Sequence, residues 1–505
     1  MQPSDWNTLF PLLTVVTTAG FVLALAVIGH LGRLGRAAGW AAAGISVLGL
    51  AFSAWMTWCQ WCNIPTGGAW EGFGGLLRVD RFTCLVNLLI LGGALLSVLV
   101  SSSLADNLKS FACEYFALLV LAVFGMMVMV GTTDLVVLLV GLETMSLAVY
   151  VLVGIRRDDK RDVEAALKYF LIGAFASGFL IYGIALMYGD SGSTRLEEIA
   201  HVLTSGGGGA GKLILAAMGL VLVGLFFKVS AVPFHMWVPD AYEGAPLPIT
   251  AFMAVAVKAA AFAVLVRVLL VGFLPLAELW LPVLWTLAVV TMTLGNLAAI
   301  FQGNIKRMLA YSSIAHAGYL LVALASLAPE PGILAQQETL VSVLYYLVVY
   351  TLMNFGAFGV LIYLERGGSP METLEQVRGT GFRYPVLGAA MALFMFSLAG
   401  IPPTGGFMGK FYVFSAAVRG DLVLLAVLGV LNSAVSVYYY LRVTVQMYMR
   451  ESSDEDVNGG TPLPQLSFSL PMFLALSFCV IGVLYLGVQP SSLLEAAGRA
   501  AASIF

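Results

Sequence analysis

Residues 226–258 read FFKVSAVPFHMWVPDAYEGAPLPITAFMAVAVK. Lys228 lies in a long apolar run that Pro233 interrupts, and three further prolines precede a second apolar run that holds Lys258. A charged side chain at the centre of a bilayer costs roughly 3 kcal/mol or more, so such residues are generally kept for function. Two lysines beside a broken helix therefore indicate a charge-handling site inside a membrane.

The whole chain has the composition of a polytopic membrane protein. Of its 505 residues, 60% are hydrophobic and 10% are charged, whereas a soluble protein carries about 25% charged residues. The net charge of −3 and the lack of a basic tract give no indication of nucleic-acid binding. The first residues show no basic segment followed by a small-residue cleavage site, so we expect no cleaved signal peptide.

We predict an all-α fold with fourteen membrane spans, since each apolar run approaches the roughly 20 residues that a bilayer requires. The seventh and twelfth runs are interrupted, by Pro233 in SAVPF and by Pro402 and Pro403 in AGIPPTGGF. Proline removes a backbone donor, which a membrane tolerates only where protein or water compensates. The predicted spans are 9–29, 41–60, 82–102, 112–131, 134–154, 163–188, 212–233, 247–271, 280–301, 306–327, 338–364, 384–415, 421–447 and 466–488.

Basic residues in the predicted loops are unevenly divided between the two sides of the membrane. The side richer in Lys and Arg is expected to be cytoplasmic, which places both termini outside. The richer side holds Arg33, Arg36, Lys109, Arg156, Arg157, Lys160, Arg161, Lys306, Arg307, Arg366, Arg378, Arg383, Arg442 and Arg450. The other side holds Arg78, Arg81, Arg195, Lys212, Arg267, Arg419 and Arg499.

The four remaining basic residues lie inside apolar runs, and all are lysines: Lys168, Lys228, Lys258 and Lys410. Arginine cannot readily lose its proton, whereas a lysine removed from water can. The exclusive use of lysine therefore favours proton transfer. Static ion pairs and snorkelling are the alternatives, and Lys168, near the start of its helix, is the best placed to snorkel.

Two further titratable residues lie at mid-depth. Glu143, in LLVGLETMSLAVY, is expected to pair with a lysine from another helix. At about 4 Å and an effective dielectric constant near 20 such a pair gains roughly 4 kcal/mol, so making and breaking it would load and release a proton. A static structural pair is the alternative. His316, at the centre of the tenth span, is a candidate proton shuttle, with a satisfied core histidine as the alternative.

The chain also carries a faint internal repeat. GLETMSLAVYVLVG (141–154) aligns with AYSSIAHAGYLLVA (310–323), and the same offset aligns FKVSAVP (227–233) with FSLAGIP (396–402). The copies start five helices apart, so we expect opposite membrane orientations, as in transporters built from inverted repeats. The predicted divisions are a three-helix segment (1–111), a first repeat (112–271), an inverted repeat (280–447) and an acidic loop with a last helix (448–505).

Other motifs carry no chemistry. GGGGAGK (206–212) resembles the start of a P-loop, but Leu213 replaces the required Ser or Thr. We interpret it as a flexible loop, the acidic ESSDEDVNGG (451–460) as a solvated loop, and the many Met and aromatic residues as ordinary membrane core. One mid-membrane histidine cannot supply two axial haem ligands. The cysteines are Cys59, Cys62, Cys84, Cys113 and Cys479, and we expect the C-Q-W-C pair to pack simply, with a local disulfide as the alternative.

Several long motifs resemble the antiporter-like subunits of respiratory complex I. They are FKVSAVPFHMWVPDAYEGAP, FMAVAVKAAAF, GNLAAIFQGNIKRMLAYSSIAHAGYLL and SLAGIPPTGGFMGKFYVF, in that order, and the resemblance covers about residues 130–445. The family includes related subunits of multisubunit cation/proton antiporters and membrane hydrogenases. Lys410, where subunit M has a glutamate, and Tyr242, where most relatives have a histidine, favour the subunit N (subunit 2) branch.

The resemblance implies roles for individual residues. Glu143 resembles the glutamate of helix five, Lys228 the helix-seven lysine paired with it, and Lys258 the central lysine of helix eight. Four others match by position: Lys410 the helix-twelve lysine near the outer half-channel, Lys168 a helix-six lysine, His316 a helix-ten histidine on the central polar axis, and Lys306 a basic residue at the cytoplasmic end of that helix.

The resemblance further implies a proton-translocating subunit of NADH:quinone oxidoreductase in a bacterial inner membrane, where the orientation expected from the loop charges makes both termini periplasmic. NADH, FMN, iron–sulfur clusters and quinone are expected in partner subunits, and no cofactor in this chain. The expected partners are M-type and K- or J-type membrane subunits and the lipid bilayer. A subunit of a cation/proton antiporter or membrane hydrogenase, and a purely structural membrane subunit, are the alternatives.

Overall fold

The computed structural model describes residues 3–32, 35–65, 67–101, 104, 108, 111–205, 211–327, 332–365, 371–449, 466 and 468–505. Parts of the loops interpreted above lie outside these residues. They are 206–210 of the glycine run, the acidic segment 451–460, and Arg33, Lys109, Arg366 and Arg450 of the charge comparison.

The fold is the all-α membrane architecture that the sequence predicts. Thirteen helical segments within the described residues are long and apolar enough to cross a membrane. The continuous spans are α1 (Pro3–Gly32), α2 (Gly35–Asn63), α3 (Arg81–Val100), α5 (Ala112–Val130), α6 (Leu135–Val153), α7 (Lys160–Ser191), α9 (Lys212–Val229), α13 (Ala277–Ile300), α14 (Ile305–Ala325), α15 (Ile333–Glu365), α19 (Val423–Met449) and α21 (Leu470–Val488). The predicted twelfth span is divided into α17 (Pro385–Ala399) and α18 (Gly405–Arg419).

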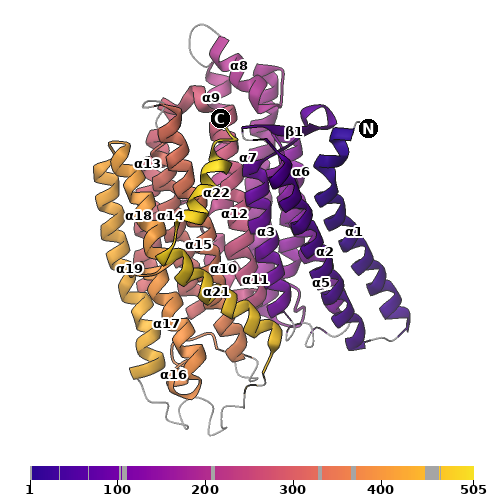
Figure 1. The fold of residues 1–505 in the computed structure, drawn as a ribbon, viewed down its shortest axis with the longest axis vertical. Helices are drawn as coiled ribbons and strands as arrows, with labels where there is room; N and C mark the ends of the chain where they lie inside the picture. The colour runs from indigo at the N-terminus through magenta and orange to yellow at the C-terminus, as the bar shows by residue number, and fades with distance from the viewer. Residues whose placement is uncertain are drawn as a thin grey trace.

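The spans run side by side along the long axis, and both termini lie at the same end of the molecule (Figure 1). The same end carries α8 (Leu196–Ser205) and a hairpin of β1 (Ala69–Gly72) and β2 (Leu77–Asp80), which pair antiparallel on either side of η1 (Phe73–Gly75). The hairpin is the one departure from all-α structure among the described residues. The chain ends with α22 (Ser491–Ala501), packed against α15 and α3.

Three spans form the centre of the bundle. In α14, α15 and the eighth span, 94% of the most apolar stretch is buried, compared with 33% in α2, α19 and α21. Apolar side chains such as Phe21, Phe175 and Leu431 remain exposed on the outer helices. The outer helices therefore present the surface for lipid, and the central helices hold the buried polar groups.

Both predicted interruptions are present. α9 ends at Val229, Ser230 takes a left-handed φ of 67°, and the chain turns through Pro233 into the short α10 (Trp237–Gly244). In the second case, α17 ends at Ala399, Gly400 has a φ of 87°, and a turn with Pro402 and Pro403 leads into α18. Each break leaves the last carbonyls of a helix without helical partners.

The eighth span has an irregularity that the sequence does not predict. Two π-helical turns, η3 (Met253–Val257) and η4 (Val268–Gly272), interrupt it and leave the α-helical pieces α11 (Leu247–Phe252) and α12 (Lys258–Arg267). Lys258 directly follows the first π turn. Such turns are rare and frequently occur at functional sites. Short connecting helices complete the set: η5 (Leu274–Leu276) and α16 (Thr380–Arg383).

Candidate functional site

Lys228 occupies a buried pocket between α9, α6 and α7. Its side chain is on the last turn of α9, and the residue is 3% exposed. The ammonium donates to the Ser146 hydroxyl at 2.7 Å and to the Tyr150 hydroxyl at 3.5 Å. It also lies 5.4 Å from the centre of the Tyr150 ring. The break after Val229 puts this cation at a helix C-terminus, where the helix dipole favours positive charge.

The predicted direct contact between Glu143 and Lys228 is absent. No ion pair within 4.0 Å joins these two described residues, and Glu143 instead accepts a hydrogen bond from the Ser177 hydroxyl. The physical reason is that Ser146, three positions along α6, presents a hydroxyl on the same helix face as the glutamate. Lys228 therefore bonds the neutral hydroxyls of Ser146 and Tyr150 and not the charged Glu143.

Lys258, the first residue of α12, is 2% exposed. Its ammonium donates to the Ser313 carbonyl at 2.7 Å and to the hydroxyl of the same serine. It lies 5.9 Å from the centre of the Tyr350 ring. The π-helical turn before Lys258 and the bond to α14 together fix this lysine at the centre of the bundle.

His316 lies one turn after Ser313 on α14 and is 1% exposed. Its Nδ1 is 2.5 Å from the Tyr346 hydroxyl and its Nε2 is 2.9 Å from the Tyr440 hydroxyl. A neutral imidazole has one donor and one acceptor nitrogen, and a tyrosine hydroxyl can complement either. Both ring nitrogens are thus bonded to groups that can give or take a proton.

Lys410 on α18 shows why the second helix break matters. Its ammonium donates to the Leu398 carbonyl at 2.8 Å, the Ala399 carbonyl at 2.9 Å and the Ser433 hydroxyl at 2.9 Å. The two carbonyls belong to the last turn of α17, which the break at Gly400 leaves without helical partners. The interruption therefore supplies the carbonyl oxygens that accept hydrogen bonds from Lys410, which is only 4% exposed.

One face of α14 connects Lys258 with Lys410. Ser313, His316 and Tyr319 follow one another at three-residue intervals, so they lie close together along one helix. Ser313 binds Lys258, the rings of His316 and Tyr319 are 5.5 Å apart, and the Tyr319 ring is 5.2 Å from the Lys410 nitrogen. Polar groups thus continue from one buried lysine to the next.

A second series of aromatic residues runs from Lys228 toward Lys258. The Tyr150 and Tyr169 rings are 4.6 Å apart, and Tyr169 stacks on Trp237 at 4.3 Å. Trp237 contacts Tyr242, which lies near Ser313, the residue that binds Lys258. The three buried lysines therefore belong to one connected polar and aromatic system.

The sequence interpretation missed the tyrosines and serines of this system. Treating the aromatic residues as ordinary membrane core was wrong for Tyr346, Tyr350 and Tyr440, which surround His316. A tyrosine in an apolar run gives no signal of its own. Only the alignment of Tyr150 with Tyr319 gave one, and each of these two rings lies beside a buried lysine.

Lys168 is in a different setting from the three buried lysines. Its side chain is 48% exposed and pairs with Glu164 at 2.8 Å and Asp240 at 3.3 Å. Asp240 also pairs with Arg307 at 2.9 Å. Lys168 thus belongs to a group of ion pairs near the helix ends, as a snorkelling lysine does.

Lys306, at the start of α14, is also near a helix end but is 1% exposed. Its ammonium donates to the Ala245 carbonyl at 2.9 Å and pairs with Glu372 at 3.2 Å. Unlike the three central lysines, it has a carboxylate partner.

The assumption that no arginine lies in the interior is wrong. Arg267, the last residue of α12, is 2% exposed, and both of its terminal nitrogens donate to the Asp80 carboxylate at 3.0 Å. Asp80 also caps α3 by accepting from the Thr83 backbone at 2.7 Å. Arg267 is five residues from the end of its span, so its side chain can reach the Asp80 carboxylate at the end of β2. The two residues are far apart in the sequence, and no local pattern predicts this pair.

No group of three His, Cys, Asp or Glu side chains within the described residues is arranged to hold a metal ion. All five cysteines are free thiols, so Cys59 and Cys62 form no disulfide in this structure. The lack of a cofactor in this chain stays a prediction.

Comparison with known proteins places this arrangement in a family. The sequence model described as "NADH:quinone oxidoreductase/Mrp antiporter, TM" matches residues 132–436. The chain belongs to the NADH:quinone oxidoreductase/Mrp antiporter family. A family member in Trichlorobacter lovleyi, NADH-quinone oxidoreductase subunit N, is 45% identical over 430 residues, which is 85% of each chain.

Solved structures of the family have the same fold. A chain of respiratory complex I from Thermus thermophilus is 34% identical, with a TM-score of 0.76 over 95% of this chain and 98% of that one. A chain of the Mrp complex from Dietzia sp. DQ12-45-1b is 22% identical, with a TM-score of 0.82 over 100% of this chain and 98% of that one. The family match includes Glu143, His316 and all three buried lysines.

Proposed function

We propose that this chain is a proton-translocating membrane subunit of NADH:quinone oxidoreductase. The observation that carries the proposal is the set of three buried lysines without a described carboxylate within 4.0 Å of their nitrogens. An unpaired buried ammonium is costly, so a fold that keeps three of them has a use for a group that can release its proton. The name of the Trichlorobacter relative supports the same function.

The proposed proton path follows the contacts of these lysines. A proton on Lys228 passes by the aromatic series and internal water to Lys258, then by Ser313 and His316 to Lys410 and outward. Lys228 now bonds the neutral Ser146. Moving its ammonium to the neighbouring Glu143 would strengthen its hold on the proton, and moving it back would weaken that hold.

The source of energy lies outside this chain in the proposal. Partner subunits would hold NADH, FMN, iron–sulfur clusters and the quinone. Quinone reduction in those subunits drives the exchange of the Lys228 ammonium between Ser146 and Glu143. M-type and K- or J-type membrane subunits are the proposed neighbours. The proposed location is a bacterial inner membrane, with the end that carries both termini on the periplasmic side, in keeping with the charge of the loops.

We also propose that residues 112–271 and 280–447 are two repeats of opposite orientation, flanked by 1–111 and 448–505. The broken helices at Pro233 and at Pro402–Pro403 occupy matching positions in the two. Lys168 belongs to the proposed pathway only at its margin, because its ion pairs with Glu164 and Asp240 already satisfy it.

The test is Lys258→Ala in the assembled complex, reconstituted in vesicles that report proton uptake. We expect fewer protons moved per NADH oxidised, because the central group of the path is lost. Lys212→Ala is the matched control, since Lys212 is exposed at the start of α9. Unchanged pumping per electron in Lys258→Ala would refute the role given to Lys258.

A cation/proton antiporter subunit is the second candidate, because the Dietzia Mrp chain shares the fold over the whole length of this chain. The two functions differ in their need for sodium. Proton uptake by the vesicles that depends on NADH and quinone, and is unchanged when sodium is replaced by choline, favours the complex I subunit. Proton movement driven by a sodium gradient alone favours the antiporter.

A further inference from the structure

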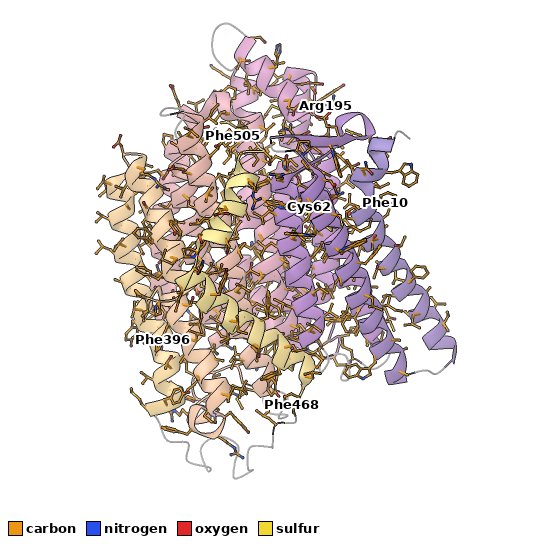
Figure 2. The ribbon with its side chains drawn as sticks, viewed as in Figure 1. Phe10, Cys62, Arg195, Phe396, Phe468 and Phe505 are labelled. Carbon is orange, nitrogen blue, oxygen red and sulfur yellow. The ribbon has the colours of Figure 1, made fainter. Side chains whose placement is uncertain are left out.

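An apolar groove lies between α17, α21 and the end of α15, apart from the lysine path. Its volume is about 890 Å³, and its walls include Val386 and Leu393 of α17 and Phe473 and Val480 of α21. Val386 is 74% exposed and Phe473 is 47% exposed, so the groove opens on the surface of the bundle. Figure 2 shows Phe468, just before α21, at the end of the molecule opposite to Phe505. The groove thus begins at the end expected to face the cytoplasm.

One end of the groove is polar. Arg383 is the only charged residue among its described lining residues, and Tyr384 and Tyr363 lie beside it. The Arg383 guanidinium is 5.9 Å from the centre of the Tyr384 ring. Arg383 is the last residue of α16, two positions before the start of α17, and tyrosine and arginine are typical of the interface between lipid headgroups and acyl chains.

The length of the groove matches one leaflet of a bilayer. The lining residues of α17 extend from Pro385 to Leu393, which is about 12 Å of helix. Half of a hydrocarbon core is about 15 Å. A transmembrane helix of a partner subunit would need a contact along the full thickness of about 30 Å. The dimensions therefore favour a lipid over a helix.

We propose that this groove is a binding site for one anionic phospholipid. Its phosphate is bound by Arg383, and its acyl chains lie along the apolar walls of α17 and α21. Guanidinium groups bind phosphate oxygens with paired, charge-assisted hydrogen bonds. Basic pockets between membrane helices on the cytoplasmic side are typical sites for anionic headgroups. The site is independent of the proton path.

The test uses the intact complex in phosphatidylcholine nanodiscs that contain a trace of phosphatidylglycerol with a photoreactive diazirine on one acyl chain. After irradiation, mass spectrometry of the digested chain should find adducts on α17 and α21. Arg383→Gln should lower this labelling about tenfold, which corresponds to the loss of one charge-assisted contact. Arg161→Gln is the matched control, because the Arg161 side chain is 80% exposed at the same end of the bundle and outside the groove. Its labelling should equal that of the wild type.

A second variant tests the apolar half of the site. Ala390 lines the groove on α17, and Ala390→Trp should fill it and abolish labelling while Arg383 remains. Phosphatidylcholine with the same diazirine should label the wild-type groove about tenfold less than phosphatidylglycerol. Equal labelling by the two lipids, or unchanged labelling in Arg383→Gln, would overturn the proposal. Lipid adducts that are found on a partner subunit and are absent from α17 and α21 would also overturn it.

Discussion

Replacing Arg267 by methionine should severely destabilise the end of the bundle that carries both termini. The Asp80 carboxylate is fully buried, and two of its hydrogen bonds come from Arg267 at 3.0 Å. Removing one partner of a buried ion pair leaves the other charge uncompensated, which costs about 3–5 kcal/mol. The two Thr83 bonds that remain, from its backbone at 2.7 Å and its hydroxyl at 2.8 Å, carry no charge. Arg78, 3.7 Å from Asp80 and bonded to Glu197, replaces the lost positive charge only in part.

The pH dependence gives this prediction a sign. Burial raises the pKa of the Asp80 carboxyl, but the charge and hydrogen bonds of Arg267 outweigh burial and hold that pKa below its ordinary value. The ion pair therefore stabilises the wild type above the ordinary carboxyl pKa of about 3.9, and this stability is lost as the pH falls through the lowered folded value. In Arg267→Met the charge and hydrogen bonds of Arg267 are lost while burial remains, so the Asp80 pKa rises. The variant should thus gain stability relative to the wild type as the pH falls from neutral.

The assay is equilibrium unfolding of the chain in mixed micelles at several pH values. Arg78→Met is the control, because Arg78 is 3.7 Å from Asp80 but bonds the 56%-exposed side chain of Glu197 at 2.5 Å. Such partly exposed pairs contribute about 0–1 kcal/mol. The double variant Asp80→Leu with Arg267→Met should recover most of the loss. A single-variant cost near that of Arg78→Met, or one that grows on acidification, would refute the reasoning.

Three further predictions concern the central path. Tyr346→Phe removes the hydroxyl bonded to His316 at 2.5 Å and should lower proton pumping per electron without loss of assembly; equal pumping would contradict a role for this hydroxyl. Ser146→Ala removes the 2.7 Å bond to Lys228 and should slow pumping at low driving force, because the lysine keeps only the longer, 3.5 Å bond to the neutral Tyr150 hydroxyl; vesicle measurements at graded quinone concentrations check this. Asn354 is fully buried and neither amide atom has a hydrogen-bond partner, so Asn354→Leu should leave thermal stability equal or higher, and a lower melting temperature would count against it.

The fold was largely predictable because the apolar runs and prolines are local signals. The predicted break at SAVPF matches the end of α9 at Val229, and the break at AGIPPTGGF matches the end of α17 at Ala399. The π-helical turns around α12 were not predictable. The residues of these turns form an unbroken apolar run, which gives no local signal of a π turn. The position of each turn depends on how the eighth span packs against α14 and α15, and this packing is not visible in the sequence.

The candidate site was predictable in its lysines and histidine but not in their partners. Lys228, Lys258 and Lys410 stand out because charge in an apolar run is rare. Their acceptors are serine hydroxyls and backbone carbonyls, which are common in any membrane helix and carry no pattern. For the same reason the sequence predicted a Glu143–Lys228 pair, since it could not show that the nearer acceptor would be Ser146.

The segment α12 connects the buried Lys258 with the ion pair between Arg267 and Asp80. Lys258 and Arg267 are its first and last residues, nine positions and therefore about 14 Å apart. A π-helical turn adjoins each end of the segment, and Arg267 is held by Asp80, so the segment can tilt about its Arg267 end. A tilt of about 10° would displace the Lys258 backbone by roughly 2.4 Å over this length. That displacement is close to the length of the 2.7 Å bond between Lys258 and Ser313, so the ion pair between Arg267 and Asp80 and the hydrogen bond of Lys258 are geometrically linked through one short helix.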